Sequence, residues 1–255
     1  MSIRSYEDAL HVKPTRQDPI MNETSRIENC SKWYIEDQLD LDKTLIRFRY
    51  QSLKPYIQGP EGLELGPAEG QMTQFLLNDF HKLTVVDGSA ELLDFIPDAP
   101  SLFKVHALFE GFDTDQRFNT VLMEHVLEHV EQPVSLLLRA KEWLAPGGRI
   151  LVGVPNGHSI HRLVAVKMGL LKEPCELNTR DIALGHRRVY TRQTLKKDLE
   201  LAGLSVIIMG GVFFKPLSNQ QIQDHWTKDM IQGFYELGKD FPEYSAELYA
   251  VLEVP

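Results

Sequence analysis

The chain has 255 residues, of which 43% are hydrophobic and 25% are charged, and its formal net charge is −9. These values are typical of a globular protein that buries a sizeable core. The negative balance and the lack of a basic stripe argue against nucleic acid as the main partner. The two cysteines, Cys30 and Cys175, lie outside any C-x-x-C motif, so no disulfide or zinc framework is expected. No apolar stretch of about 18 residues occurs, and we expect a cytoplasmic protein without a membrane partner.

The N-terminal quarter of the chain precedes the regular alternation of strands and helices. Residues 1–25 are polar and predict an arm with little core. From Ile27 to Tyr56 apolar residues recur at roughly helical spacing, which predicts one or two helices. The Gly59-Pro60 pair then ends this region. We therefore divide the chain into an N-terminal region, residues 1–56, and a core, residues 57–255.

The core opens with a predicted strand, a glycine-bearing turn and a helix. The run Gly62-Leu63-Glu64-Leu65 predicts the strand, and the helix begins at Gln71. Between them lie Gly66 and Gly70, where the backbone can approach a ligand closely. The turn is not the dinucleotide fingerprint, which would need a glycine at Ala68, and it lacks the Gly-Lys-Ser/Thr of a P-loop. In open parallel sheets ligands bind beyond the carboxyl ends of the strands, so this turn predicts a ligand site.

Further strands and helices alternate along the core, as in a doubly wound βαβ series. Strands are predicted at residues 83–87, 103–107, 118–123, 149–156, 204–209 and 246–254, and helices at 134–143, 191–202 and from Asn219 to about Gly238. The predicted fold class is α/β, a seven-stranded Rossmann-like doubly wound sheet with helical cap insertions.

Acids and histidines follow two of the predicted strand ends. Asp87 ends the second strand about 20 residues after the glycine turn, where an acid can accept both hydroxyls of a ribose. Its alternative role is to cap the next helix. Glu124 ends the fourth strand, and His125 and His129 share one face if this segment turns helically. A neutral imidazole can accept a proton from a hydroxyl or an amine. Together with Glu128 the histidines also suggest metal ligation, but no further acidic cluster follows and we predict no metal.

Two motifs carry a resemblance to a known family. Residues 64–70, Glu-Leu-Gly-Pro-Ala-Glu-Gly, resemble the E/D-x-G-x-x-x-G loop of class I S-adenosylmethionine (SAM) dependent methyltransferases. Residues 127–130, Leu-Glu-His-Val, resemble a segment of the ubiquinone-biosynthesis-like branch of that family. The resemblance covers residues 60–210 and implies SAM as the cofactor. It implies the following cofactor-binding residues: Glu64, Gly66, Pro67, Ala68, Gly70, Asp87, Gly88, Leu108, Phe109, Glu110 and Glu124.

The resemblance also implies a lid, because the helices before the core lie across the cofactor pocket in such enzymes. Residues 157–190 interrupt the alternation of strands and helices and predict a cap insertion at the ligand-facing edge. This insertion is dense in polar side chains, which suit an anionic or polyhydroxylated acceptor. The candidate substrate-binding residues are Tyr34, Arg49, Asn156, His158, His186, Arg187 and Tyr190. Packing or surface roles are the alternative for each, and His186 and Arg187 are preferred.

The implied activity is methyl transfer from SAM to an oxygen of a small polar metabolite, including saccharide- or phosphate-containing ones. His129 or His125 would act as the catalytic base. N-methylation of an amino sugar or another small amine is the first alternative. A nicotinamide-dependent oxidoreductase and a non-catalytic nucleoside-binding module are alternatives of other classes. The expected partner is a small-molecule acceptor, and a homodimer is left open.

Overall fold

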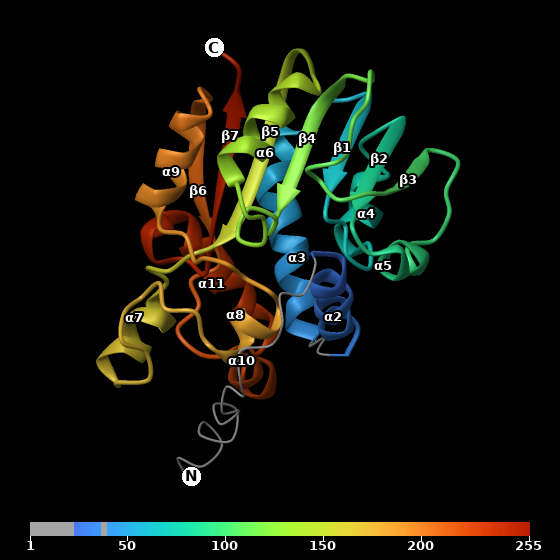
Figure 1. The fold of residues 1–255 in the computed structure, drawn as a ribbon. Helices are drawn as coiled ribbons and strands as arrows, with labels where there is room; N and C mark the ends of the chain where they lie inside the picture. The colour runs from blue at the N-terminus through green and yellow to red at the C-terminus, as the bar shows by residue number, and fades with distance from the viewer. Residues whose placement is uncertain (1–22, 37–39) are drawn as a thin grey trace.

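The computed structural model describes residues 23–36 and 40–255. Within them a seven-stranded sheet in the order β3-β2-β1-β4-β5-β7-β6 is covered by helices on both faces (Figure 1). The strands β1 to β5 are parallel to their neighbours, whereas β7 is antiparallel to both β5 and β6. The strands are β1 Glu61–Leu65, β2 Lys82–Asp87, β3 Leu102–His106, β4 Phe118–Glu124, β5 Leu144–Pro155, β6 Ser205–Val212 and β7 Glu247–Glu253. The predicted seven-stranded α/β fold is confirmed.

The described helices connect these strands and extend the fold at its N-terminal side and in the segment after β5. They are α2 Glu23–Glu36, α3 Asp40–Leu53, α4 Gln71–Leu76, α5 Ala90–Phe95, α6 Pro133–Glu142, α7 Ile160–Lys167, α8 Thr179–Ala183, α9 Arg192–Leu201, α10 Asn219–His225 and α11 Lys228–Asp240. The α7 and α8 helices lie within the segment predicted as a cap insertion. No described helix is long and apolar enough to cross a membrane.

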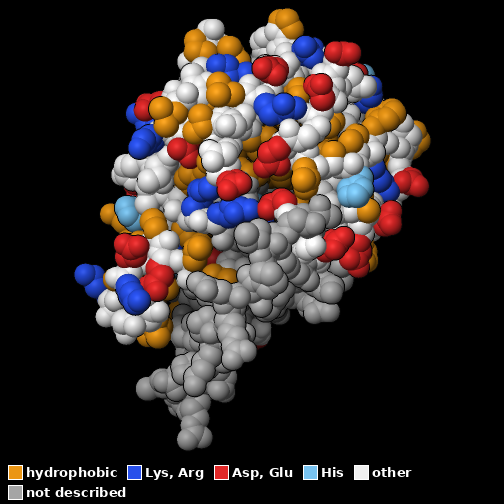
Figure 2. All heavy atoms as spheres, viewed as in Figure 1, with side chains coloured by type: hydrophobic (Ala, Val, Ile, Leu, Met, Phe, Trp, Pro, Cys, Tyr) orange, Lys and Arg blue, Asp and Glu red, His pale blue; other side chains and the backbone are white. Residues whose placement is uncertain are grey.

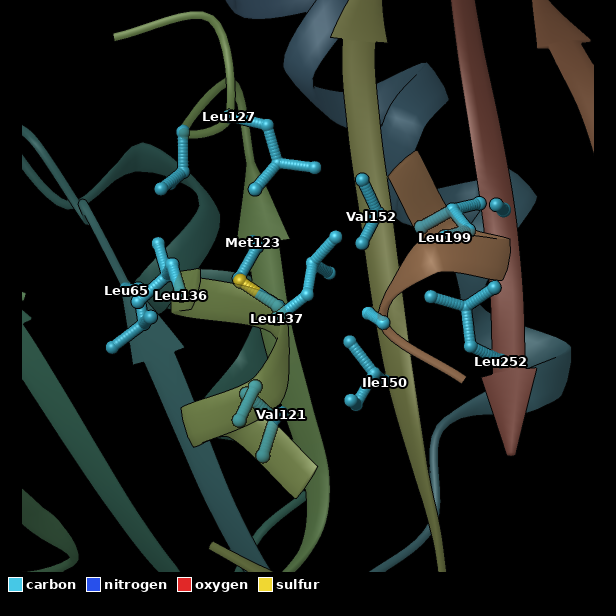
Figure 3. Packing of buried hydrophobic residues seen from close by; sticks show 14 of the residues in the cluster. Leu65, Val121, Met123, Leu127, Leu136, Leu137, Ile150, Val152, Leu199 and Leu252 are labelled. Carbon is cyan, nitrogen blue, oxygen red and sulfur yellow. The ribbon is translucent and has the colours of Figure 1, made fainter. Parts of the chain in front are cut away.

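The central strands are apolar on both faces because helices cover both sides of the sheet. Side chains of a strand alternate between its faces. Val121 and Met123 of β4 therefore pack with α6 and α9 in the cluster drawn in Figure 3, where Leu137 and Leu199 face the sheet. The intervening Leu122 packs on the opposite face.

The α3 helix covers that opposite face and is part of the core. Leu53 packs in the same cluster as Leu122. Phe48 is fully buried and stacks on Tyr235 of α11, with the ring centroids 4.1 Å apart. Of the two helices before the core, only α2 therefore has the position expected of a lid.

The start of β5 and the α8 helix differ most from the prediction in the segment after α6. The β5 strand begins at Leu144, which pairs with Phe118 before the register shifts through the Pro146-Gly147-Gly148 turn. The short α8 helix was not predicted, although its capping box is visible as Asn178 followed by Asp181.

The predicted long helix from Asn219 is two helices, α10 and α11. The α10 helix ends before Trp226, and Thr227 caps α11 by accepting a hydrogen bond from the Met230 backbone. The N-cap of α10 is Ser218, whose hydroxyl accepts the Gln221 backbone N–H.

Candidate functional site

A pocket of about 1180 Å³ opens at the carboxyl ends of β1, β2 and β4. Every predicted cofactor-binding residue except Gly70 lines it, as do His125, His129 and Arg49. Residues 23, 26, 27, 30 and 31 of α2 line it too, and this spacing corresponds to one face of a helix. The pocket therefore lies between the edge of the sheet and the α2 helix.

The glycine turn after β1 is held in left-handed backbone conformations. Gly66 has φ +67° and donates its N–H to the Val86 carbonyl at 2.9 Å. Gly70 has φ +82°, and a Cβ there would lie 2.8 Å from Ile96. The missing side chain of Gly70 thus permits both the left-handed backbone of the turn and its close packing on Ile96. Gly70 does not line the pocket and affects it through the shape of the turn.

The acids at the ends of β1 and β2 are buried in the pocket floor. Glu64 accepts a hydrogen bond from the Thr73 hydroxyl at 2.7 Å, and burial raises its pKa to about 8. Asp87 accepts the Ser89 backbone N–H at 2.8 Å, and burial raises its pKa to about 6. Ser89, not Asp87, is the N-cap of α5. The Asp87 carboxylate therefore stays available to the pocket that it lines.

The loop after β3 and the α2 helix form opposite walls of the pocket. Leu108, Phe109 and Glu110 follow β3 and line the pocket. A Cβ at Gly88 would lie 2.8 Å from Ile27 of α2 and 3.2 Å from Leu108. Glycine is thus needed at position 88, because Ile27 and Leu108 both pack closely against its backbone.

His125 follows β4 in a left-handed conformation, with φ +54°, and donates its backbone N–H to the Gly153 carbonyl. Its ring Nδ1 lies 3.3 Å from Glu128, and its Nε2 lies 3.5 Å from Glu247. Burial, together with the nearby Arg49 guanidinium, lowers the pKa of His125 to about 4. The ring is therefore neutral at neutral pH, and carboxyl groups face both of its nitrogens.

His129 lines the pocket one helical turn further along. Its ring packs edge-to-face on His186, with the centroids 4.7 Å apart. Burial, with a contribution from His186, lowers the pKa of His129 well below its ordinary value. At neutral pH the imidazole is uncharged and can accept a proton.

Arginines around the site bind other groups of the protein. Arg26 and Arg187 both form ion pairs with Glu23, and both donate to the His129 carbonyl. Arg188 donates to the Leu127, Val130 and Glu131 carbonyls. These guanidinium groups hold α2, the segment after β4 and the insertion together. On the described part of the face in Figure 2, basic and acidic side chains are likewise interspersed.

Several predicted substrate-binding residues do not line the pocket. The Asn156 amide donates to the Glu243 and Ser245 carbonyls, and the Tyr190 hydroxyl donates to Asp198. Both side chains therefore have structural partners, and their contact with a substrate stays a prediction. His158, Arg187 and His186 also lie outside the pocket lining, and the His186 ring packs on His129. The Tyr34 side chain lies outside the described residues.

A candidate ligand set for a metal ion lies beside the pocket. Three possible ligand atoms lie within 4.8 Å of one another, one each from Glu128, His129 and His186. Glu128 is fully buried, and neither of its carboxyl oxygens has a hydrogen-bond partner in the described part of the chain. Carboxylate and imidazole together suit a divalent transition metal. The sequence predicts no metal, and that expectation stays a prediction.

Sequence reasoning missed Glu247 and the pocket face of α2. Glu247 is the first residue of β7, and it binds Arg49 through two hydrogen bonds of 2.6 Å. The available signals were an acid at the start of the last strand and the helical spacing of Glu23, Arg26 and Ile27.

Comparisons with known proteins agree with this geometry. Residues 38–208, more than half of the chain, match the family model described as "Methyltransferase domain". A ubiquinone biosynthesis O-methyltransferase from Aeromonas salmonicida is 25% identical over 177 residues, which cover 64% of this chain and 70% of the relative. The same enzyme from Dinoroseobacter shibae is 32% identical over 131 residues, 46% of this chain and 51% of the relative.

Solved structures share the fold at low sequence identity. The N-methyltransferase NodS from Bradyrhizobium japonicum, in complex with S-adenosylhomocysteine, has a TM-score of 0.57 at 17% identity and covers 92% of this chain and 100% of its own. The plantazolicin methyltransferase BpumL has a TM-score of 0.56 at 17% identity, with 88% of each chain covered. The chain therefore belongs to the methyltransferase-domain family and is a class I SAM-dependent methyltransferase.

Proposed function

We propose that the chain methylates a hydroxyl oxygen of a small, polar and uncharged acceptor, with His129 as the general base. The observation that carries this proposal is the position of His129. It is a neutral imidazole in the lining of the same pocket as the glycine turn, Asp87 and Glu124. The names of the sequence relatives, which are O-methyltransferases, support transfer to oxygen.

The residues present fit SAM. Gly66 and Asp87 both line the pocket, and the Asp87 carboxylate can accept the ribose hydroxyls. Glu124 lines the pocket with one buried carboxyl oxygen that has no hydrogen-bond partner among the described residues, and it suits the ammonium of an amino acid. When bound, SAM supplies an already activated methyl group on a sulfonium. The protein therefore has to orient the acceptor, exclude water and remove a proton.

Proton removal distinguishes the two histidines. A hydroxyl starts protonated, so its oxygen needs a base as the new bond to carbon forms. Both ring nitrogens of His125 face carboxyl groups. His129 lines the pocket, and its ring packs edge-to-face on His186 and forms a hydrogen bond with the Gly185 backbone. We therefore assign the base to His129 and a supporting role to His125.

The charges around the site favour an uncharged acceptor. Arg26 and Arg187 are paired with Glu23, and Arg49 is paired with Glu247. Glu124 lines the pocket and Glu128 is fully buried beside it, and both carboxyl groups would repel an anion when ionised. Among the described residues that surround the pocket, a phosphate or carboxylate on the acceptor would therefore meet arginines that are already paired, whereas hydroxyl groups could donate to the carboxyl oxygens.

The test is a screen of hydroxyl, amine and phosphate-bearing metabolites for SAM-dependent formation of S-adenosylhomocysteine, followed by His129→Ala. We expect turnover of the best hydroxyl acceptor to fall about 10²–10⁴-fold, the range of general-base catalysis, while affinity for S-adenosylhomocysteine is retained. His158→Ala is the matched control, because His158 lies outside the pocket lining. Full turnover in His129→Ala would refute the base assignment. An amine as best acceptor would favour the N-methylation alternative.

A further inference from the structure

Glu247 is a buried carboxylate that neither family motif includes. It is 7% exposed and begins β7, where it pairs in register with Pro155 at the end of β5. Because β7 runs antiparallel to β5, its first residue lies at the edge where the parallel strands end. The fold thus brings a residue from the C-terminal end of the chain to the edge of the cofactor pocket.

The carboxylate of Glu247 contacts two residues that line the pocket. Arg49 of α3 donates from Nε to Oε2 and from Nη2 to Oε1, both at 2.6 Å. Such a bidentate pair is short, charge-assisted and fixed in its plane. The Nε2 atom of His125 lies 3.5 Å from Oε1 of the same carboxylate. Glu247 therefore joins α3, the loop after β4 and β7.

The pairing leaves Arg49 with donors to spare. A guanidinium carries five N–H donors in a rigid fork, and two of them bind Glu247. Within the described residues no other hydrogen bond of Arg49 occurs. Since Arg49 lines the pocket, the carboxylate sets the direction in which the remaining donors meet an anionic group such as the cofactor carboxylate.

The same carboxylate governs the orientation of His125. Burial alone would raise the pKa of Glu247, but Arg49 and His125 hold it well below its ordinary value, so it is ionised. An anion beside a neutral imidazole favours the tautomer that carries its proton on the facing nitrogen, Nε2. The Nδ1 atom of the ring then faces the Glu128 carboxyl group, 3.3 Å away.

We propose that Glu247 is a positioning residue for methyl transfer, which aims the free edge of Arg49 into the pocket and holds His125 as the Nε2–H tautomer between two carboxyl groups. This role depends on the chain being a methyltransferase. It does not depend on whether the acceptor atom is oxygen or nitrogen.

The experiment compares Glu247→Gln with Glu253→Gln. Glu253 is on the same strand and also binds an arginine, Arg149 at 2.9 Å, but it sits at the other end of β7. Each variant removes one charge and one ion pair. Calorimetry with S-adenosylhomocysteine tests Arg49, and ¹⁵N NMR of the histidine rings reports the tautomer of His125, so neither measurement needs an acceptor.

In Glu247→Gln we expect about tenfold weaker binding of S-adenosylhomocysteine, which corresponds to about 1.4 kcal/mol, and loss of the single Nε2–H tautomer. Glu253→Gln should match the wild type in both. Unchanged tautomer and affinity in Glu247→Gln, or equal losses in both variants, would overturn the proposal. If Glu247→Gln does not fold, Glu247→Asp serves in its place, because it keeps the charge. Glu247→Asp should retain the Nε2–H tautomer of His125 and bind S-adenosylhomocysteine with intermediate affinity. Loss of that tautomer in Glu247→Asp would also overturn the proposal. Failure of the wild type to bind S-adenosylhomocysteine would instead count against the cofactor itself.

Discussion

Replacing Gly70 with alanine separates the shape of the glycine turn from contact with the cofactor. Gly70 has φ +82° and does not line the pocket. A non-glycine residue in this left-handed conformation costs about 1–2 kcal/mol. The new Cβ would also lie 2.8 Å from Ile96, which is 1% exposed and has no room to retreat. Overpacking of this kind costs about 1–3 kcal/mol more. We therefore expect Gly70→Ala to lower the free energy of unfolding by about 2–5 kcal/mol.

Gly147→Ala provides the matched control for this prediction. Gly147 also has a left-handed backbone, with φ +72°, but a Cβ there would meet nothing within 4 Å. It should therefore show only the conformational cost, about 1–2 kcal/mol. Urea unfolding of both variants measures the difference, which isolates the contact with Ile96. Equal losses in the two variants would show that the packing of the turn on α5 is not what requires glycine.

Three further predictions concern the pocket. In the folded protein the pKa values of Glu64, Glu124 and Glu128 are raised to about 8. Between the ordinary pKa of a glutamate and pH 8, the folded state therefore binds more protons than the unfolded state. The stability of the ligand-free protein should therefore fall as the pH rises from 6.5 to 8, and a melting temperature that rises over this range would contradict the assignment. Asp87→Asn should weaken calorimetric binding of S-adenosylhomocysteine about tenfold or more, through the loss of a charge-assisted acceptor; unchanged affinity would exclude Asp87 from the ribose site. Added Zn²⁺ should inhibit turnover reversibly by binding His129 together with Glu128 and His186, whereas activation by Zn²⁺ would argue against His129 as the base.

The strands of the sheet and the residues at their carboxyl ends could be predicted from local patterns. Glu64, Asp87 and Glu124 each follow an apolar run, and parallel strands bring such ends to one edge. The same reasoning put the glycine turn beside Asp87, since both follow neighbouring strands. These inferences needed only the order of elements along the chain and the direction of the strands.

Partners in tertiary contacts could not be predicted in this way. The density of arginine and histidine in the insertion suggested substrate binding, but Arg187 and Arg188 bind Glu23 and backbone carbonyls. A sequence shows that a guanidinium is present and leaves open which acceptor it meets. Glu247 escaped notice for a related reason. An antiparallel strand places its first residue, not its last, at the ligand edge, and that direction is a property of the assembled sheet.

The charges of the pocket connect these observations with the reaction. In the ligand-free site the buried carboxyl groups of Glu64 and Glu124 favour their neutral forms, because burial penalises the charge. A cationic ligand that brings an ammonium and a sulfonium stabilises the ionised forms and offsets that cost. Transfer removes the sulfonium charge, so the product complex loses part of this compensation. The acidic floor of the pocket therefore favours binding of the substrate form of the cofactor over the product form. An unpaired Arg49 would repel a cationic ligand, but its ion pair with Glu247 neutralises this charge, so the last strand of the sheet contributes to the electrostatics of the site.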